Sequence, residues 1–379
     1  MRCEHFDQGE CASCSWIARP YAEQLAAKNS QLHSLLDSYR PREWREPVAS
    51  PEAGFRNKAK MAALGTADAP LLGIVNHRGD AVGLCDCPLY PEDMQALLRR
   101  IQHWIKQAGL PPYRIDKRQG ELKFVLLTRS QFSGEFMLRF VLRSEATLAR
   151  IKKHLTLLLD ESPNIRVVSA NIQPAHMAII EGEQEIFLSE NTRLAERLNH
   201  VPLFIRPKSF FQTNTALAAT LYATAREWAA EIKPSTLWDL YCGVGGFGLH
   251  CAAADTTLTG IEIEPEAVAC AQMSAAALGL KQVSFAAFDA AAFAAPPFTV
   301  QQGAAPDLVI VNPPRRGLGE TLCRQLLAMA PKNIFYSSCN PETLVRDLAQ
   351  LAGYQLDRVQ LFDMFPHTAH YEVLVKLSR

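Results

Sequence analysis

The chain has 379 residues, a formal net charge of zero at pH 7 and 48% hydrophobic residues. This length predicts two domains with a small appendage, because domains commonly span about 100–200 residues. The sequence has no apolar run long enough for a membrane span and no signal-peptide core, and its balanced charge argues against indiscriminate binding to polyanions. We therefore expect a cytoplasmic protein that is not attached to a membrane. In that reducing compartment its ten cysteines should not pair as disulfides.

Three cysteines near the N-terminus form the pattern C-x7-C-x2-C, and two more follow far downstream. Three closely spaced thiols with a remote fourth indicate a metal or cluster site, because four thiolates can close a tetrahedral shell. Cys87 is the expected fourth ligand, since it precedes a proline as the last ligand of iron–sulfur runs often does, whereas Cys85 fits a small buried hydrophobic residue. Zinc satisfies the same spacing, and free surface thiols are the other alternative. The expected ligands are Cys3, Cys11, Cys14 and Cys87.

The sequence of residues 1–205 predicts two structural parts, an N-terminal segment and a central domain. Residues 1–48 should form a short segment with the cysteine pattern and one helix, which a proline at position 41 ends. In residues 49–205, short apolar runs alternate with turns, which predicts an α+β domain with a largely antiparallel sheet. We expect strands at 59–64, 71–75, 124–128, 136–142, 166–171 and 177–180, and helices near 91–108 and 147–159.

Two basic segments of this central domain are candidate contacts for phosphate. The first alternates its charges at strand spacing, which would put Arg56, Lys58 and Lys60 on one face. The second, with Lys117 and Arg118, is typical of a loop that enters a strand. Each segment could equally be a solvated edge that protects the sheet from aggregation. In an enzyme that acts on nucleic acid they become candidate RNA contacts.

The pattern changes to α/β over residues 206–379. A buried strand at 236–241 leads into a glycine-rich loop at 242–248, and we expect a helix to start at Leu249. The next strand, 258–261, ends at Glu262, an acid suitably placed for ribose hydroxyls. Strand, glycine loop, helix, strand and acid in this order predict a doubly wound fold that binds a nucleotide cofactor.

The glycine loop separates two kinds of cofactor. It lacks the G-x-G-x-x-G spacing that seats a pyrophosphate, and an acid, Asp239, precedes it. The loop resembles the first motif of S-adenosylmethionine-dependent methyltransferases. Asp289, which closes the next strand-like run at 283–288, then matches the adenine contact. The alternative is an enzyme that uses NAD.

Five segments together resemble the RNA uracil-5-methyltransferase family: 211–214, 239–248, 312–315, 338–341 and 363–372. The resemblance implies a Rossmann-like methyltransferase domain, S-adenosyl-L-methionine as methyl donor and, through the cysteine pattern, the ribosomal branch of the family. That branch implies 23S ribosomal RNA as partner and a four-iron, four-sulfur cluster rather than zinc. We expect a monomer. The donor contacts matched to the family are Gln212, Tyr241, Glu262 and Asn312, beside Asp289.

The chemistry of uracil explains two further residues. Uracil C5 is a poor nucleophile until a group adds to C6, which a thiolate at Cys339 would do. A base must later remove the C5 proton, and Glu372 matches that role. Since an RNA duplex buries this edge of the base, the uridine must be unpaired or flipped out, and Phe210 could stack in the gap or belong to the core. His367 and His370 lack a positioned third ligand and are expected to be structural.

Three other functions remain open on these residues. Asn-Pro-Pro followed by an aromatic residue marks enzymes that methylate an exocyclic amine, but Arg315 takes the aromatic position here, and Cys339 would have no purpose in that reaction. A cytosine-5 enzyme would be mechanistically closer. The chain could also act as an RNA-binding ribosome assembly factor that retains a donor pocket.

Overall fold

The computed structural model describes residues 1–176, 180–295 and 305–379. These residues form two compact units, and two stretches of chain belong to each. The first unit comprises residues 1–14 and 52–196, and the second comprises 15–51 and 197–379. The expected N-terminal part, 1–48, is therefore divided: its cysteines join the first unit, while its helix joins the second. The helices of the described residues include none long and apolar enough to cross a membrane.

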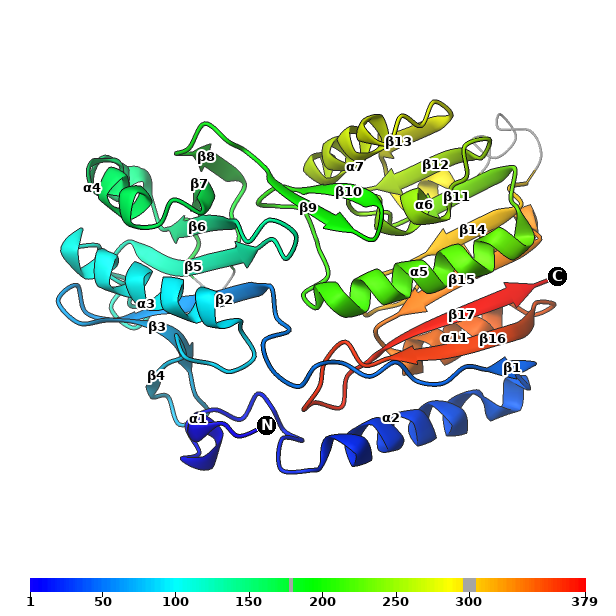
Figure 1. The fold of residues 1–379 in the computed structure, drawn as a ribbon, viewed down its shortest axis with the longest axis horizontal. Coiled ribbons are helices and arrows are strands. Elements are labelled where there is room, and N and C mark those ends of the chain that lie inside the picture. The colour runs from blue at the N-terminus through cyan, green and yellow to red at the C-terminus, as the bar shows by residue number, and fades with distance from the viewer. Residues whose placement is uncertain (177–179, 296–304) are drawn as a thin grey trace. The chain divides into compact units, whose positions relative to one another are not determined.

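A sheet with strand order β4-β3-β2-β5-β6-β7-β8 forms the first unit (Figure 1). Neighbouring strands are antiparallel except β6 and β7, which confirms the largely antiparallel sheet. Of the last expected strand, residues 177–179 lie outside the described part of the chain. The elements are α1 (Glu4–Asp7), β2 (Lys58–Gly65), β3 (Pro70–Val75), β4 (Ala81–Gly83), α3 (Glu92–Gln107), β5 (Leu122–Arg129), β6 (Phe136–Leu142), α4 (Leu148–Glu161), β7 (Ile165–Ile172) and β8 (Gln184–Phe187), with a 3-10 turn at Glu145–Thr147.

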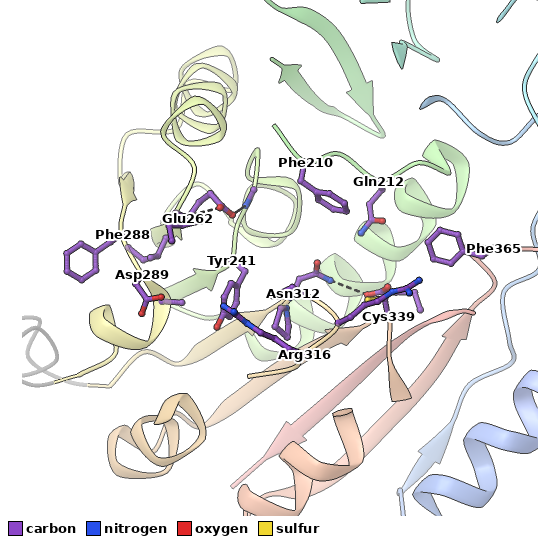
Figure 2. A pocket seen from close by; sticks show the side chains of 18 residues that line it. Phe210, Gln212, Tyr241, Glu262, Phe288, Asp289, Asn312, Arg316, Cys339 and Phe365 are labelled. Carbon is purple, nitrogen blue, oxygen red and sulfur yellow. Dashed lines mark hydrogen bonds between the residues drawn. The ribbon is translucent and has the colours of Figure 1, made fainter. Parts of the chain in front are cut away.

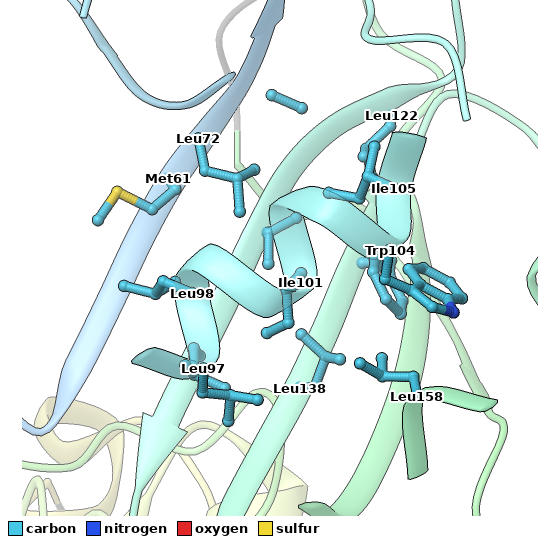
Figure 3. Close-up of a cluster of buried hydrophobic side chains, with 14 of the residues drawn as sticks. Met61, Leu72, Leu97, Leu98, Ile101, Trp104, Ile105, Leu122, Leu138 and Leu158 are labelled. Carbon is cyan, nitrogen blue, oxygen red and sulfur yellow. The ribbon is translucent and has the colours of Figure 1, made fainter. Parts of the chain in front are cut away.

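The core of the first unit lies between this sheet and helices α3 and α4 (Figure 3). Apolar residues recur at helical spacing in α3, so Leu97, Ile101 and Trp104 share one buried face. Leu138 of β6 and Met61 of β2 meet that face from the sheet. Strand β2 alternates: Ala59 and Met61 are buried, while Lys58 and Lys60 point to the other side.

The second unit holds a mainly parallel sheet with strand order β1-β16-β17-β15-β14-β11-β12-β13. Strand β17 is antiparallel to both of its neighbours, β15 and β16. The elements are α2 (Tyr21–Leu36), β1 (Glu43–Trp44), α5 (Thr215–Ile232), β11 (Thr236–Leu240), α6 (Gly246–Cys251), β12 (Thr257–Glu262), α7 (Pro265–Ala277), β13 (Val283–Ala287), α8 (Ala290–Phe293), β14 (Leu308–Val311), α10 (Gly319–Met329), β15 (Asn333–Ser338), α11 (Pro341–Gln350), β16 (Gln355–Phe362) and β17 (Glu372–Ser378), with a 3-10 turn at Asp37–Tyr39. A separate pair, β9 (Leu194–Leu198) and β10 (Val201–Ile205), precedes α5.

Both faces of this sheet are covered, as the near-continuous apolar strands require. One face packs against helices α2, α8, α10 and α11 in a single apolar cluster that includes Ile334 and Tyr336 of β15. Phe335, between them, faces the other way and meets Trp228 of α5 at a ring distance of 5.9 Å. This arrangement confirms the Rossmann-like fold. Helix α6 begins at Gly246, three residues earlier than the sequence suggested.

Candidate active site

The glycine loop after β11 is shaped by a buried carboxylate. Asp239 is fully buried and accepts the backbone N–H of Gly248 at 2.7 Å, which ties the first turn of α6 to the strand. A Cβ atom at position 248 would lie 2.8 Å from the Asp239 carboxylate, so this contact requires glycine. Burial raises the pKa of Asp239 to about 7. The acid that precedes the loop therefore supports the loop's shape and is not among the residues that line the cavity described below.

Glu262 ends β12 and organises the opposite side of the loop. Its carboxylate accepts the backbone N–H groups of Gly243 at 3.0 Å, Ile263 at 2.8 Å and Glu264 at 3.1 Å. Tyr241 and Gly243 adopt left-handed backbone angles, φ 66° and φ 54°, which turn the chain at the strand end. The acid is thus fixed at the carboxyl edge of the parallel strands, where doubly wound folds bind ligands.

A cavity of about 530 Å³ opens at this edge of the second unit. In Figure 2, Glu262, Phe288 and Asp289 lie at one side of it and Cys339, Gln212 and Phe365 at the other. The structure brings together all five expected donor contacts, both expected catalytic residues and the expected stacking residue. The cavity-lining residues predicted from the sequence are Phe210, Gln212, Tyr241, Glu262, Asp289, Asn312, Cys339 and Glu372.

Cys339 lies between the end of β15 and the start of α11 and is partly exposed in the cavity. Burial raises the pKa of its thiol, and the negative charge of Glu372 adds to this effect. The guanidinium of Arg315 acts in the opposite direction, through its positive charge and a hydrogen bond to the thiol. Arg315, which the sequence marked only as the replacement of an aromatic residue, thus lies where a cation favours the thiolate.

Glu372 begins β17 and is only 2% exposed. The hydroxyl of Ser337 donates a hydrogen bond to its carboxylate, and the side-chain amide of Asn312 donates another at 3.1 Å. Burial outweighs these two bonds and raises the pKa of Glu372 to about 7. A carboxylate with that pKa is suited to accept a proton near neutral pH.

Asp289 has a second function in the fold. It precedes α8, and its side chain accepts the backbone N–H of Ala292 at 2.9 Å as an N-cap. The residue also lines the cavity next to Phe288, which is 37% exposed. The cap fixes the direction of the carboxylate at the edge of the cavity.

Three residues of the site carried no signal strong enough for a prediction. Phe365, which follows β16 in an irregular segment, and Ile263, which is 72% exposed directly after Glu262, line the cavity. Ser337 is a buried strand residue that belongs to the site through its hydrogen bond to Glu372. The position of Ile263 after the strand-ending acid was the only available signal for it. Phe210, at 63% exposure, is not a core residue, which removes that alternative.

The four expected metal-ligating cysteines all belong to the first unit. Burial and the nearby thiols of Cys87, Cys11 and Cys3 raise the pKa of Cys14, to about 12 in total, so the four thiols are close enough to influence one another. Within the described part of the chain, however, no group of three His, Cys, Asp or Glu side chains is arranged to hold a metal ion. Cys85 is buried, and its thiol lies 3.4 Å from the Gln102 side chain, consistent with a structural role.

The basic segments divide between two environments. Lys58 and Lys60 share a face of β2, and burial, with the charge of Lys60, lowers the pKa of Lys58 to about 8. Arg56 precedes the strand, and its positive charge offsets part of the rise in the pKa of Cys14 and Cys87, so it lies near the thiols. Lys117 and Arg118 are exposed in the loop before β5.

Among the residues that the structure describes, His367 and His370 belong to no group of three His, Cys, Asp or Glu side chains that could hold a metal ion. His367 is fully buried, and its ring Nδ1 lies 3.3 Å from the side-chain nitrogen of Gln24 in α2. Burial and the charges of Arg315 and Lys28 lower the pKa of His370. The structural role expected for the two histidines stays a prediction.

The fold and cavity define a class of protein: an S-adenosylmethionine-dependent methyltransferase with a cysteine and a carboxylate in its donor pocket. A family model described as "tRNA (Uracil-5-)-methyltransferase" matches residues 183–379. The chain belongs to this family, and it is a methyltransferase.

Particular relatives resemble the chain over its whole length. It is 60% identical over 383 residues to the 23S rRNA (uracil(747)-C(5))-methyltransferase RlmC of Shewanella halifaxensis, with 100% of each chain covered. The RlmC of Shewanella pealeana is 60% identical over 379 residues, again with 100% of both chains covered. Among solved structures, the Pyrococcus abyssi tRNA (uracil-54, C5)-methyltransferase in complex with S-adenosyl-L-homocysteine has a TM-score of 0.79 and 26% identity, covering 96% of this chain and 85% of that one.

Proposed function

We propose that this enzyme methylates C5 of one uridine in 23S ribosomal RNA, at the position equivalent to the uracil 747 named for its relatives. The observation that carries the proposal is a single cavity that holds a thiol, a carboxylate with a pKa of about 7 and the residues of a nucleotide-type pocket. Identity of 60% over the full length supports the same substrate class.

Glu262 and Asp289 would hold the nucleoside part of S-adenosylmethionine, with Tyr241, Gln212 and Asn312 along the rest of the cavity. When bound, S-adenosylmethionine supplies an electrophilic methyl group to C5. The residues of the chain do the rest. Cys339, as thiolate, adds to C6 of the uracil and makes C5 nucleophilic. Glu372 then takes the proton from C5, and the bond between C6 and the Cys339 sulfur breaks.

The substrate is tested with fragments of 23S ribosomal RNA and labelled S-adenosylmethionine. We expect 5-methyluridine in the digested product, at one position, and no label when that uridine is replaced by cytidine. A methylated exocyclic amine or 5-methylcytidine would indicate one of the alternative methyltransferases. RNA binding without any methyl transfer would instead favour an assembly factor. We further propose that the enzyme acts on this RNA in the cytoplasm and as a monomer.

We also propose that Cys3, Cys11, Cys14 and Cys87 hold a [4Fe–4S] cluster in the first unit. The donor set fits this group, because the charges of Cys3 and Cys11 contribute to the raised pKa of both Cys14 and Cys87, which brings thiols from two distant segments together. Contacts within the unit support the approach of these segments: the His5 ring nitrogen lies 2.9 Å from the Asp86 carboxylate, next to Cys87. The methyl transfer needs no electron, so we assign the cluster a structural or RNA-positioning role.

Replacement of Cys87 by serine should abolish cluster binding, whereas Cys85→Ser should leave it intact. The pair is matched, because both cysteines lie in the same short loop but only Cys87 interacts with the N-terminal thiols. Iron and sulfide content and the visible absorbance of protein purified without oxygen measure the difference. Equal iron content in the two variants would contradict the ligand set, and zinc in place of iron would contradict the kind of cluster.

For RNA binding we propose contacts from Arg56, Lys58, Lys60, Lys117, Arg118 and Phe210. Replacement of both Lys117 and Arg118 by alanine should weaken RNA binding and reduce the slope of log affinity against log salt by roughly one per lost phosphate contact. A matched control removes the same charge at Lys152 and Lys153, which are exposed on α4 of the same unit. Titrations at several salt concentrations decide; identical slopes for the two double variants would refute a specific contact at the loop.

A further inference from the structure

The segment between β16 and β17 supplies two parts of the active site. Phe365 lines the cavity, and Glu372 follows at the first position of β17. Residues 363–371 between the two strands contain neither helix nor strand. Regular hydrogen bonding therefore does not fix the position of Phe365, and other contacts must do so.

Two buried polar side chains of α2 supply those contacts. The ammonium of Lys28 donates hydrogen bonds to the Asp363 carboxylate at 2.6 Å and to the backbone oxygen of Phe365 at 3.1 Å. Gln24 accepts the backbone N–H of His367 at 2.8 Å. Gln24 and Lys28 are both fully buried and lie four residues apart, on one face of the helix. Helix α2, some 340 residues earlier in the sequence, thus fixes the segment that places Phe365 in the cavity.

This face of α2 is polar only where it contacts residues 363–371. The same stripe continues with Leu32 and Leu36, which belong to the apolar cluster of the sheet. Burial lowers the pKa of Lys28, and both members of the pair with Asp363 are fully inaccessible. Since a buried ion pair is weak evidence for stability, and well-packed apolar residues often serve as well, a function in specifying geometry is the better explanation of its presence here.

We propose that Lys28 is a positioning residue of the methylation reaction, supported by Gln24, and that it holds Phe365 against the target uracil beside Cys339. Phe365 lies on the same side of the cavity as Cys339 in Figure 2, away from Glu262 and Asp289. Lys28 therefore acts on the base and not on the nucleoside part of the methyl donor. This inference rests on the proposed roles of Cys339 and Glu372.

The test compares three variants of the full chain. Lys28→Met with Asp363→Asn removes both buried charges together, so neither is left unpaired. Phe365→Leu removes the aromatic ring and leaves the contacts of α2 intact. Leu36→Met changes the same helix face two turns from Lys28 and serves as the control. We measure the unfolding midpoint, kcat, the KM for S-adenosylmethionine, and the rate of covalent adduct formation with RNA that contains 5-fluorouridine.

We expect the double variant and Phe365→Leu to lose at least about tenfold in kcat and in adduct rate, because displacement of the base by about 1 Å has effects of that size or larger. Their KM for S-adenosylmethionine should remain that of the wild type, as should all values of Leu36→Met. Wild-type kcat and adduct rate in a folded double variant would overturn the proposal. If the double variant does not fold, wild-type kcat and adduct rate in Phe365→Leu are by themselves enough to overturn the proposal. Failure of the wild type itself to form an adduct would refute the proposed function instead.

Discussion

Replacement of Cys339 by alanine is expected to reduce methyl transfer to RNA by at least about 10⁴-fold, since removal of a covalent nucleophile has effects of this size in other enzymes. Cys339 lines the cavity between β15 and α11; burial raises the pKa of its thiol, and the charge of Arg315 offsets part of that rise. The loss should appear in kcat, with little change in S-adenosylmethionine affinity, because Glu262 and Asp289, which would hold the nucleoside part of the donor, lie at the other side of the cavity. Single-turnover assays with labelled donor measure the rate, and equilibrium binding measures the affinity.

The control for this variant is Cys323→Ala. Cys323 is also in the second unit, but it is buried in α10 and does not line the cavity. The control should keep its rate within about threefold of the wild type. A Cys339→Ala protein with substantial activity would eliminate covalent catalysis through this residue.

Glu372→Gln should block the second half of the reaction and leave the first half intact. Glutamine can still receive the hydrogen bonds of Ser337 and Asn312, but it cannot take the C5 proton. We expect kcat to fall by about 10²–10⁴-fold and a methylated protein–RNA adduct to accumulate. Denaturing gels with labelled donor detect the adduct. Glu320→Gln, at an exposed glutamate of α10, is the control that should release product normally.

The raised pKa of Glu372 also predicts two effects of pH. In the wild type, product release should slow as the pH falls below about 7, where the carboxylate takes up a proton.

The stability of the fold should change in the opposite direction and increase as the pH falls. Because the folded state binds this proton more tightly than the unfolded state, the free energy of unfolding falls as the pH rises from about 4.5 to 7. Glu372→Gln should therefore be more stable than the wild type above pH 7, and equal unfolding midpoints at pH 8 would argue against the raised pKa.

The strands and the catalytic fold could be predicted because their signals are local. Alternation placed Lys58 and Lys60 on one face of β2, and the order of strand, glycine loop and acid predicted the cavity edge at Glu262. The start of α6 was predicted at Leu249, too late, because glycine is a poor helix former. Here Gly248 is needed at the close approach of Asp239, and that tertiary contact outweighs propensity.

Two features could not be predicted because contacts between distant segments determine them. They are the division of the N-terminal part between two units and the contacts that position Phe365 in the cavity. Lys28 in α2 reads as an ordinary surface lysine, and only the fold reveals that it is buried against Asp363. Phe365 similarly lacks a local pattern. Ser337 reads as a plain strand residue until β17 brings Glu372 to it. Contacts between distant segments determine all three positions.

Covalent addition of Cys339 to a uridine is the central claim, and one experiment tests it most directly. Purified protein is incubated without oxygen with labelled S-adenosylmethionine and 23S RNA fragments that contain 5-fluorouridine, which has no C5 proton for Glu372 to remove. We predict a protein–RNA adduct that carries the label, survives denaturing electrophoresis and is absent with Cys339→Ala. Methyl transfer to the natural RNA without any such adduct, or an equal adduct with Cys339→Ala, would contradict the account.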